Sequence, residues 1–261
     1  MWTYLSVIVL FLVGTVSCFP EGRVVNGTGT EIQNYPFMVS MREPTGTHWC
    51  GASMIAPRWI LTAAHCTVSF RPESLSIQYA SDVLDPNTVN QIKVKRIIEH
   101  EGYSPANNYA NDIALLQLVG GLIANGKTIV PVQLPKQSFE INQVPEGEPG
   151  VLIGWGLNAT GGYSQKKLQR VDLKIYSDNE CQTRHNNRTT IDHICGGVDE
   201  GGKGQCSGDS GGPLLNKNNI QMGIVSWSMK PCTIYPYPGV YTKVSHYVDW
   251  IKNSISKYDM L

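Results

Sequence analysis

The stretch that decides how the chain is interpreted reads QCSGDSGGP and covers residues 205–213. Glycines flank Ser210 closely on both sides, and they let the backbone turn so sharply that N–H groups can point into a site. A serine hydroxyl is a weak nucleophile unless a base takes its proton and N–H donors hold the oxyanion that forms. The candidate donors are the N–H groups of Gly208 and Ser210. A glycine-rich surface turn between two strands is the alternative interpretation.

Two upstream stretches supply the partners that such a serine needs. The sequence WILTAAHC at residues 59–66 places His65 after an apolar strand and two small alanines. The sequence NDIALLQL at residues 111–118 places Asp112 at the start of an apolar strand, where a carboxylate can be buried against an imidazole. Each stretch alone is weak evidence, because aspartate is common in turns and a histidine beside a cysteine is often structural. With Ser210 they give the chain order His, Asp, Ser, which is the order of chymotrypsin-like active sites.

From about Arg23 to the C-terminus the chain resembles the trypsin/chymotrypsin-like serine proteases, and segments 61–66, 112–116 and 208–213 carry the resemblance. The resemblance implies an all-β fold of two antiparallel six-stranded β-barrels with a C-terminal α-helix. It places the active site in the crevice between the barrels, a position typical of binding clefts.

The sequence pattern agrees with that fold, because short apolar segments alternate with turns rich in glycine and proline. The peptidase domain is expected at 24–261, with barrels at about 24–134 and 135–244. Apolar residues recur at helical spacing in residues 245–258, so an amphipathic helix should pack there on the first half. The expected strands are 35–42, 49–55, 59–62, 74–80, 91–99, 113–118, 150–155, 168–175, 213–216, 221–227 and 239–243.

The N-terminus indicates export and activation by cleavage. Residues 1–18 carry no charge and have a short apolar core, as in a secretory signal peptide, with an uncleaved anchor as the alternative. Residues 19–23 would then be an activation propeptide. The resemblance implies that cleavage after Arg23 frees the α-amino group of Val24, which inserts and pairs with Asp209. We therefore expect a secreted zymogen that is nearly inactive before cleavage.

The chain has seven cysteines, and removal of the signal peptide would take Cys18 away and leave six. An even number suits an oxidising compartment, but six cysteines allow fifteen pairings. Zinc binding is the alternative use, although no Cys-x-x-Cys pair is present. A further bridge of many relatives is missing, because Gly150 and Asn216 occupy its positions. The resemblance implies the disulfides Cys50–Cys66, Cys181–Cys195 and Cys206–Cys232.

The primary specificity pocket is expected beside Ser210. In trypsin-like relatives an aspartate six residues before the nucleophile attracts Arg or Lys, and here that position is Gly204. The implied wall positions, Ser228 and Gly239, are small and uncharged as well. Because an uncharged pocket cannot compensate a buried cation, we expect cleavage after Tyr, Phe, Trp or Leu, as in chymotrypsin. Elastase-like or tryptic cleavage is the alternative, and the amide of Gln205 is a concern because it could enter the pocket.

The resemblance also assigns the catalytic roles. Ser210 attacks the substrate carbonyl, His65 transfers the proton, Asp112 orients the imidazole, and the N–H groups of Gly208 and Ser210 hold the oxyanion. Ser226 matches a family serine that supports the buried aspartate. A non-catalytic homologue acting as a binding module is the alternative from another class, but such a protein would normally have lost one of the three catalytic residues.

Charge and composition exclude several partners. The chain has 21 Lys and Arg against 21 Asp and Glu, scattered along the sequence, so neither a nucleic-acid nor a membrane surface is indicated. We expect no cofactor and no metal, since the glutamate pair with which some relatives bind calcium is missing. The expected partners are protein or peptide substrates, an activating trypsin-like protease and protein inhibitors, and the protein should be a monomer. Glycosylation sequons occur at Asn26, Asn158 and Asn187.

Overall fold

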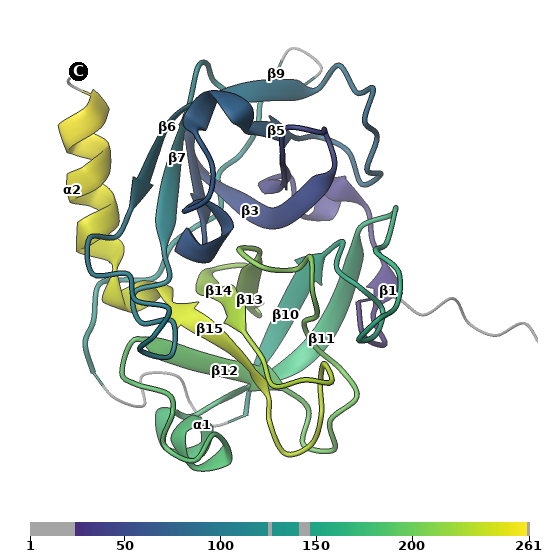
Figure 1. Ribbon diagram of the computed structural model, residues 1–261, viewed down its shortest axis with the longest axis vertical. Helices are drawn as coiled ribbons and strands as arrows, with labels where there is room; N and C mark the ends of the chain where they lie inside the picture. The colour runs from purple at the N-terminus through teal and green to yellow at the C-terminus, as the bar shows by residue number, and fades with distance from the viewer. Residues whose placement is uncertain (1–23, 125–126, 141–146, 260–261) are drawn as a thin grey trace, which may run out of the picture.

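The computed structural model describes residues 24–124, 127–140 and 147–259, and Figure 1 colours these from purple to yellow. The predicted signal peptide, the propeptide with Arg23 and part of the predicted connection 131–144 lie outside these residues. No helix of the described part is long and apolar enough to cross a membrane.

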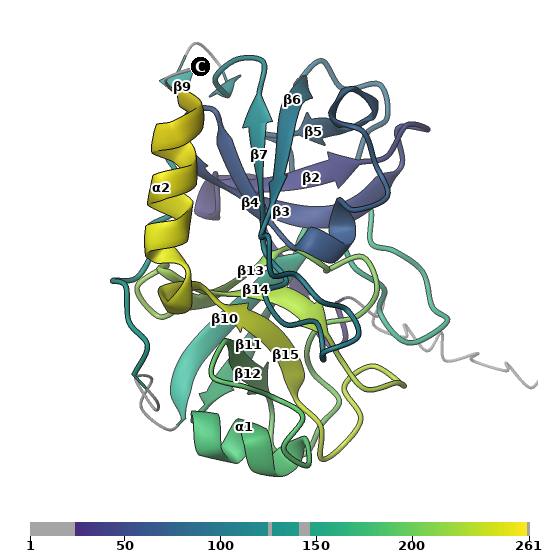
Figure 2. The same ribbon diagram turned by 60° about the vertical axis from the view of Figure 1, so that its left-hand side comes forward.

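The first half forms a closed antiparallel barrel, which is the upper one in Figures 1 and 2. Apolar residues fill its interior; β4 and β7, for example, are buried along their whole length. Each fully buried aliphatic or aromatic side chain contributes about 1.5–3 kcal/mol to folding. In order around the barrel, the strands are β2 (Met38–Arg42), β3 (His48–Ala56), β4 (Trp59–Thr62), β7 (Ala114–Leu118), β6 (Gln91–Glu99) and β5 (Ser76–Gln78).

The second half forms the lower barrel, closed by pairing of β11 with β12. A short N-terminal strand, β1 (Thr28–Gly29), adds to the edge of β11 and so ties the start of the domain to the second half. In order around this barrel, the strands are β10 (Glu148–Gly154), β13 (Pro213–Asn216), β14 (Gln221–Trp227), β15 (Gly239–Lys243), β12 (His193–Gly197) and β11 (Gln169–Tyr176). Two closed six-stranded barrels confirm the fold class expected from the sequence.

The remaining elements are short, apart from the C-terminal helix α2 (Val248–Asp259). Ile251 of α2 belongs to the same buried apolar cluster as the first barrel, and Trp59 Nε1 of that barrel donates a hydrogen bond to Asp259 Oδ1 at 3.0 Å. The C-terminal helix therefore joins the end of the chain to the first half, as expected. The others are β8 (Ile123–Ala124), β9 (Lys127–Thr128), α1 (Asp178–Arg184) and the 3₁₀ turns η1 (Ile32–Asn34), η2 (Ala64–Cys66), η3 (Pro72–Ser74) and η4 (Val244–His246).

The sequence patterns did not predict α1 or β12. Helix α1 has only seven residues, too few for a helical apolar repeat, and it depends on local capping: the Ser177 side chain accepts a hydrogen bond from the N–H of Glu180. A disulfide then attaches Cys181 of α1 to Cys195 of β12. Tertiary contacts, rather than sequence periodicity, fix these two elements.

All three disulfides implied by the resemblance are present, with the S–S distances 2.02, 2.05 and 2.08 Å. Gly150 and Asn216 lie directly opposite each other in the pairing of β10 with β13. The chain therefore has no cysteines at a place where a bridge would join two adjacent strands.

Candidate active site

The strongest interaction of the site joins His65 to Asp112. His65 lies in the 3₁₀ turn η2 directly after β4, and Asp112 lies just before β7, which pairs with β4. Asp112 has no exposed surface, and its Oδ2 accepts a hydrogen bond from His65 Nδ1 at 2.7 Å. Its Oδ1 accepts one from the His65 backbone N–H at 2.9 Å. One carboxylate thus fixes both the backbone and the ring of His65.

A residue of the second barrel completes the surroundings of this carboxylate. Ser226, in β14, donates its hydroxyl to Asp112 Oδ2 at 2.5 Å, and the hydroxyl of Thr242, in β15, donates to the Asp112 carbonyl at 2.8 Å. Asp112 thus belongs to the first barrel in sequence, but it is also held by hydrogen bonds from two strands of the second barrel. The sequence-based role of Ser226 agrees with this contact.

The loop that carries Ser210 lies against the first barrel. The Gly51 N–H of β3 donates to the Ser210 carbonyl at 2.8 Å, and the Gly211 N–H donates to Val225 of β14 at 2.8 Å. Gly211 has a φ of +76°, and a side chain there would collide with the Thr62 hydroxyl, because an added Cβ would lie 2.2 Å from it. Only glycine allows this close approach of the loop to β4.

The two predicted oxyanion donors are free within the described part of the chain. The backbone N–H groups of Asp209, Gly211 and Gly212 each donate a hydrogen bond to a backbone carbonyl. Those of Gly208 and Ser210 donate no such hydrogen bond among the described residues. The carbonyl of Ser207 accepts from Leu157 at 2.8 Å, and that of Asp209 accepts from Gly212 at 3.0 Å. In a trans peptide the N–H points away from the carbonyl. The N–H groups of Gly208 and Ser210 therefore remain available to donate hydrogen bonds to a substrate oxygen.

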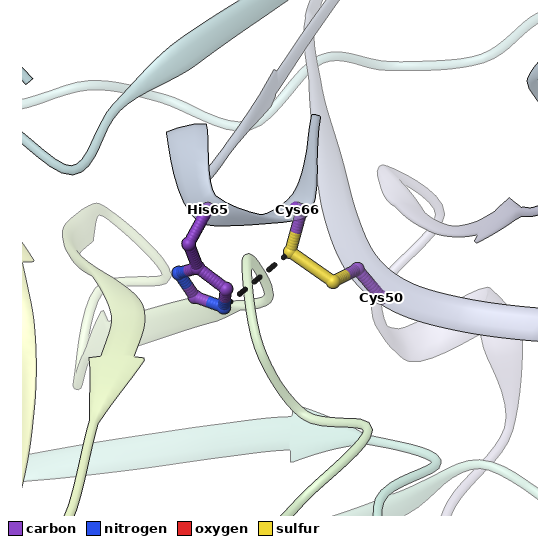
Figure 3. Close-up of side chains that lie close together, drawn as sticks. All are labelled: Cys50, His65 and Cys66. Carbon is purple, nitrogen blue, oxygen red and sulfur yellow. Dashed lines mark hydrogen bonds between the residues drawn. A yellow bond between two sulfur atoms is a disulfide. The ribbon is translucent and has the colours of Figure 1, made fainter. Parts of the chain in front are cut away.

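His65 and Ser210 line one pocket of about 260 Å³ between the barrels. No hydrogen bond links the Ser210 hydroxyl to His65 among the described residues, and His65 Nε2 instead lies 3.7 Å from Cys66 Sγ (Figure 3). Catalytic hydrogen bonds are often long in unliganded proteases and shorten when substrate binds. The pocket thus brings together Ser210 and His65, the predicted nucleophile and base, with Tyr109 beside the imidazole ring.

Cys50, His65 and Cys66 lie close enough to suggest a metal site (Figure 3). The two sulfur atoms, however, form a disulfide 2.02 Å long. A metal needs thiolates, which a disulfide does not offer. The cluster is therefore explained by the bridge that holds the His65 turn to β3.

Asp209 lies beneath the Ser210 loop with no exposed surface. Its carboxylate accepts hydrogen bonds from the N–H of Gly156 at 2.9 Å and of Cys206 at 3.0 Å. Burial raises the pKa of Asp209 to about 7, because these two amides and the charge of Lys230 offset only part of the desolvation. Val24, whose amino group is the predicted partner, is fully buried in the apolar core of the second barrel. Arg23 lies outside the described residues.

A buried histidine, not identified from the sequence, holds the other side of this loop. His48 Nε2 donates to the Gly208 carbonyl at 2.9 Å, and its Nδ1 accepts from the Ser40 hydroxyl at 2.8 Å. Burial lowers the pKa of His48 to about 4, so the ring is neutral at physiological pH. Its only sequence signal is a lone histidine before Trp49, which has no distinguishing pattern.

The predicted pocket residues are only partly brought together. Ser228 lines the pocket beside Ser210, but Gly204 and Gly239 do not. Gln205 stands in their place. Its side chain lies against Gly239, where an added Cβ would be 2.9 Å from the Gln205 Cγ, Cδ and Nε2 atoms. Among the described residues that line the pocket, none is acidic, and Lys230 is the basic side chain beside Ser228.

The three sequons differ in accessibility. The Asn26 amide donates to the Gly202 carbonyl at 2.7 Å, and the Asn158 side-chain oxygen accepts from the Tyr163 N–H at 3.1 Å. Asn187 is exposed in the turn after α1. Asn187 therefore offers the most accessible amide of the three.

Comparison with known proteins gives a consistent result. The model of the family described as Trypsin matches residues 24–251. Trypsin II-P29 of Gallus gallus is 35% identical over 261 residues, an alignment that covers 96% of this chain and 98% of that protein. Serine protease 1 of Rattus norvegicus is 34% identical over 255 residues, covering 96% and 98%. Trypsin-1 of Astacus astacus is 37% identical over 242 residues, covering 88% and 98%.

Proposed function

The chain belongs to the trypsin family of serine proteases, and we propose that it is a secreted endopeptidase in which His65, Asp112 and Ser210 form the catalytic triad. The observation that carries this proposal is the buried Asp112 carboxylate, 2.7 Å from His65 Nδ1, in a cleft that Ser210 also lines. A buried carboxylate needs compensation, and an imidazole that becomes positively charged during the reaction provides it.

The proposed reaction is acyl transfer. The Ser210 oxygen attacks the peptide carbonyl carbon while His65 Nε2 takes the hydroxyl proton, and the carbonyl electrons move to the oxygen. The N–H groups of Gly208 and Ser210 hold this oxyanion. When the tetrahedral intermediate collapses, the C–N bond breaks and the amine leaves with the proton from His65. Water then repeats the sequence on the acyl-enzyme and releases the acid.

Hydrolysis of peptides by the Ser210→Ala variant tests this proposal. We expect a loss of about 10⁶-fold in kcat, the scale seen when a protease of the same mechanism loses its serine. Gly211 packs too tightly to be varied, so Ser164→Ala, in an exposed loop, serves as the matched control. Undiminished hydrolysis by Ser210→Ala would contradict the proposal, and absence of hydrolysis by the cleaved wild type would favour a binding module.

The proposed zymogen step accounts for the buried acid beneath the serine loop. Asp209 ionises with difficulty, because burial raises its pKa to about 7. An α-ammonium at Val24, released by cleavage after Arg23, would stabilise the carboxylate and with it the loop that presents Gly208 and Ser210. A separate trypsin-like protease is the proposed activator, since none of the described residues that line the pocket is an acid that could bind an arginine.

We further propose that the enzyme does not cleave after Arg or Lys, although the relatives carry the name trypsin. A pocket with no acidic side chain among its described lining residues would leave a guanidinium or ammonium uncompensated, at a cost of several kcal/mol. The expected preference for large apolar residues assumed that small residues at 204, 228 and 239 leave the pocket open. The Gln205 side chain against Gly239 reduces that space. Hydrolysis of peptides that differ only in Arg, Phe or Ala before the cut measures the specificity.

A further inference from the structure

We propose that Gln205 closes the base of the primary specificity pocket and restricts the enzyme to small residues, such as Ala or Ser, before the cut. This inference rests on the proposed protease function and specifies its substrate class. Gln205 is only 3% exposed, yet it lines the pocket beside Ser210. Its backbone is fixed by the adjoining Cys206–Cys232 disulfide.

The Gln205 side chain is held against β14 and β15, which pair with each other beside the pocket. Its Nε2 donates to the Trp227 carbonyl at 2.6 Å, at the end of β14, and lies 3.4 Å from the Val240 carbonyl in β15. Two carbonyl partners fix the orientation of the carboxamide, because only its nitrogen can donate to them. The carboxamide is therefore fixed in place where Gln205 lines the pocket, and we infer that a long substrate side chain would meet it there.

Gly239 is small because Gln205 occupies the space beside it. An added Cβ at Gly239 would lie 2.9 Å from three Gln205 atoms, so a side chain there would force the glutamine to move. This glycine lines a separate hollow on the far side, together with Pro238 and Tyr237, and does not reach the pocket of Ser210. The small residue at 239 thus accommodates the glutamine and does not widen the pocket.

A large substrate side chain would have to displace Gln205. Moving the carboxamide would break its hydrogen bonds to the Trp227 and Val240 carbonyls. The Gln205 Oε1 atom is already buried without a donor. A small substrate side chain avoids this cost, because it does not extend as far as the carboxamide.

The test compares peptides that carry Ala, Phe or Arg before the cut, with the enzyme activated by cleavage after Arg23. We expect the wild type to favour Ala over Phe by about tenfold or more in kcat/KM, the size of discrimination that pocket volume provides. The Gln205→Ser variant should open the pocket and reverse the ratio, mainly by increased turnover of Phe. The Gln182→Ser variant, in α1 away from the cleft, is the matched control and should keep the wild-type ratio.

Labelling of Ser210 by diisopropyl fluorophosphate separates the two possible failures. The reagent has no extended side chain, so it reports nucleophile and base without depending on the depth of the pocket. Labelling combined with efficient cleavage after Phe by the wild type would overturn the inference and leave the protease function standing. An unchanged ratio in Gln205→Ser that still labels would overturn it too. Absence of labelling in the wild type would contradict both the inference about Gln205 and the proposed protease function.

Discussion

The two sides of the cleft differ in whether their buried acid, Asp112 or Asp209, contacts a basic side chain among the described residues. On the first-barrel side, Asp112 is fully buried and holds both the ring and the backbone of His65. On the second-barrel side, the loop of Ser210 covers Asp209, a buried acid that accepts two amide hydrogen bonds but has no side-chain cation in contact among the described residues. His65 is thus held by its carboxylate partner in the uncleaved chain, whereas the proposed role of cleavage after Arg23 is to supply a positive charge to Asp209 beneath the Ser210 loop.

The comparison teaches that the base and the nucleophile are controlled by different parts of the chain. The His65–Asp112 pair depends on strands and turns that are fixed when the barrels close. In the proposed mechanism, the Ser210 loop depends on the amine of Val24, which cleavage would release, and the shape of its pocket depends on Gln205. Variants that alter one side of the cleft at a time test this difference through their effect on catalytic rate.

Replacing Asp112 with Asn acts on the His65–Asp112 pair and should have the largest effect after removal of the serine itself. An amide cannot stabilise the imidazolium, and its NH₂ group favours the wrong tautomer of His65. The expected loss in kcat is about 10⁴-fold, the size known for this change in the trypsin family. Steady-state hydrolysis by the activated variant measures it. A loss below tenfold would mean that Asp112 is only structural.

Blocking cleavage after Arg23 acts on the Ser210 loop. The Arg23→Gln variant should remain at least about a hundredfold less active than the cleaved wild type, since losing one oxyanion donor alone costs that much. Incubation with trypsin followed by a peptide assay measures the activity. Arg23→Lys is the matched control, because it preserves the cleavage site and should activate normally. Full activity of the Gln variant would show that the loop is ordered without the new amine.

Replacing Ser226 with Ala tests the contact between the two sides. The Ser226 hydroxyl donates to Asp112 Oδ2 at 2.5 Å, so its removal leaves one carboxylate oxygen with a single partner. Loss of one charge-assisted hydrogen bond predicts a decrease of about tenfold in kcat/KM. The activated variant is assayed beside Ser164→Ala, in an exposed loop. Equal rates for the two variants would restrict Ser226 to a packing role.

The pH dependence of stability should reveal the uncompensated acid. In the uncleaved protein the pKa of Asp209 is raised to about 7. The folded state therefore keeps a proton that the unfolded state releases, and this contribution to stability decreases as the pH rises from about 4 to about 7. The pKa of His48, lowered to about 4, acts in the opposite direction. Because His48 is present in both proteins, its contribution to the pH dependence cancels when the parent is compared with the Asp209→Asn variant.

The measurement is urea unfolding of an Arg23→Gln, Ser210→Ala protein, with and without Asp209→Asn. Between pH 5.5 and 6.5 the parent should lose about 1 kcal/mol of unfolding free energy relative to the Asn variant, near the limit of ~1.4 kcal/mol per pH unit for one proton. Parallel pH profiles would show that Asp209 is ionised and compensated in the uncleaved chain.

Much of the fold was predictable because local patterns determine it. The strands at 91–99, 213–216, 221–227 and 239–243 were predicted with the bounds that the structure has. Their buried apolar residues and flanking turns are visible in the sequence. Helix α1 was not predicted, since a capping serine and a disulfide fix it without an apolar repeat.

The site was predictable where a residue acts through its own chemistry. His65, Asp112 and Ser226 were assigned from the motifs that contain them, and they lie in hydrogen-bond contact. The shape of the pocket was less predictable, because it depends on where Gln205 points. That direction is set by the carbonyls of Trp227 and Val240, 22 and 35 residues further along the chain.

The measurement that tests the central claim most directly is the phosphorylation of Ser210 by diisopropyl fluorophosphate, followed by mass spectrometry of the cleaved protein. The claim is that His65, held by Asp112, removes the proton from Ser210. It predicts one adduct per chain, on Ser210, at a rate that decreases by several orders of magnitude in His65→Ala. An equal rate in that variant, or an adduct elsewhere with Ser210 unmodified, would contradict the account.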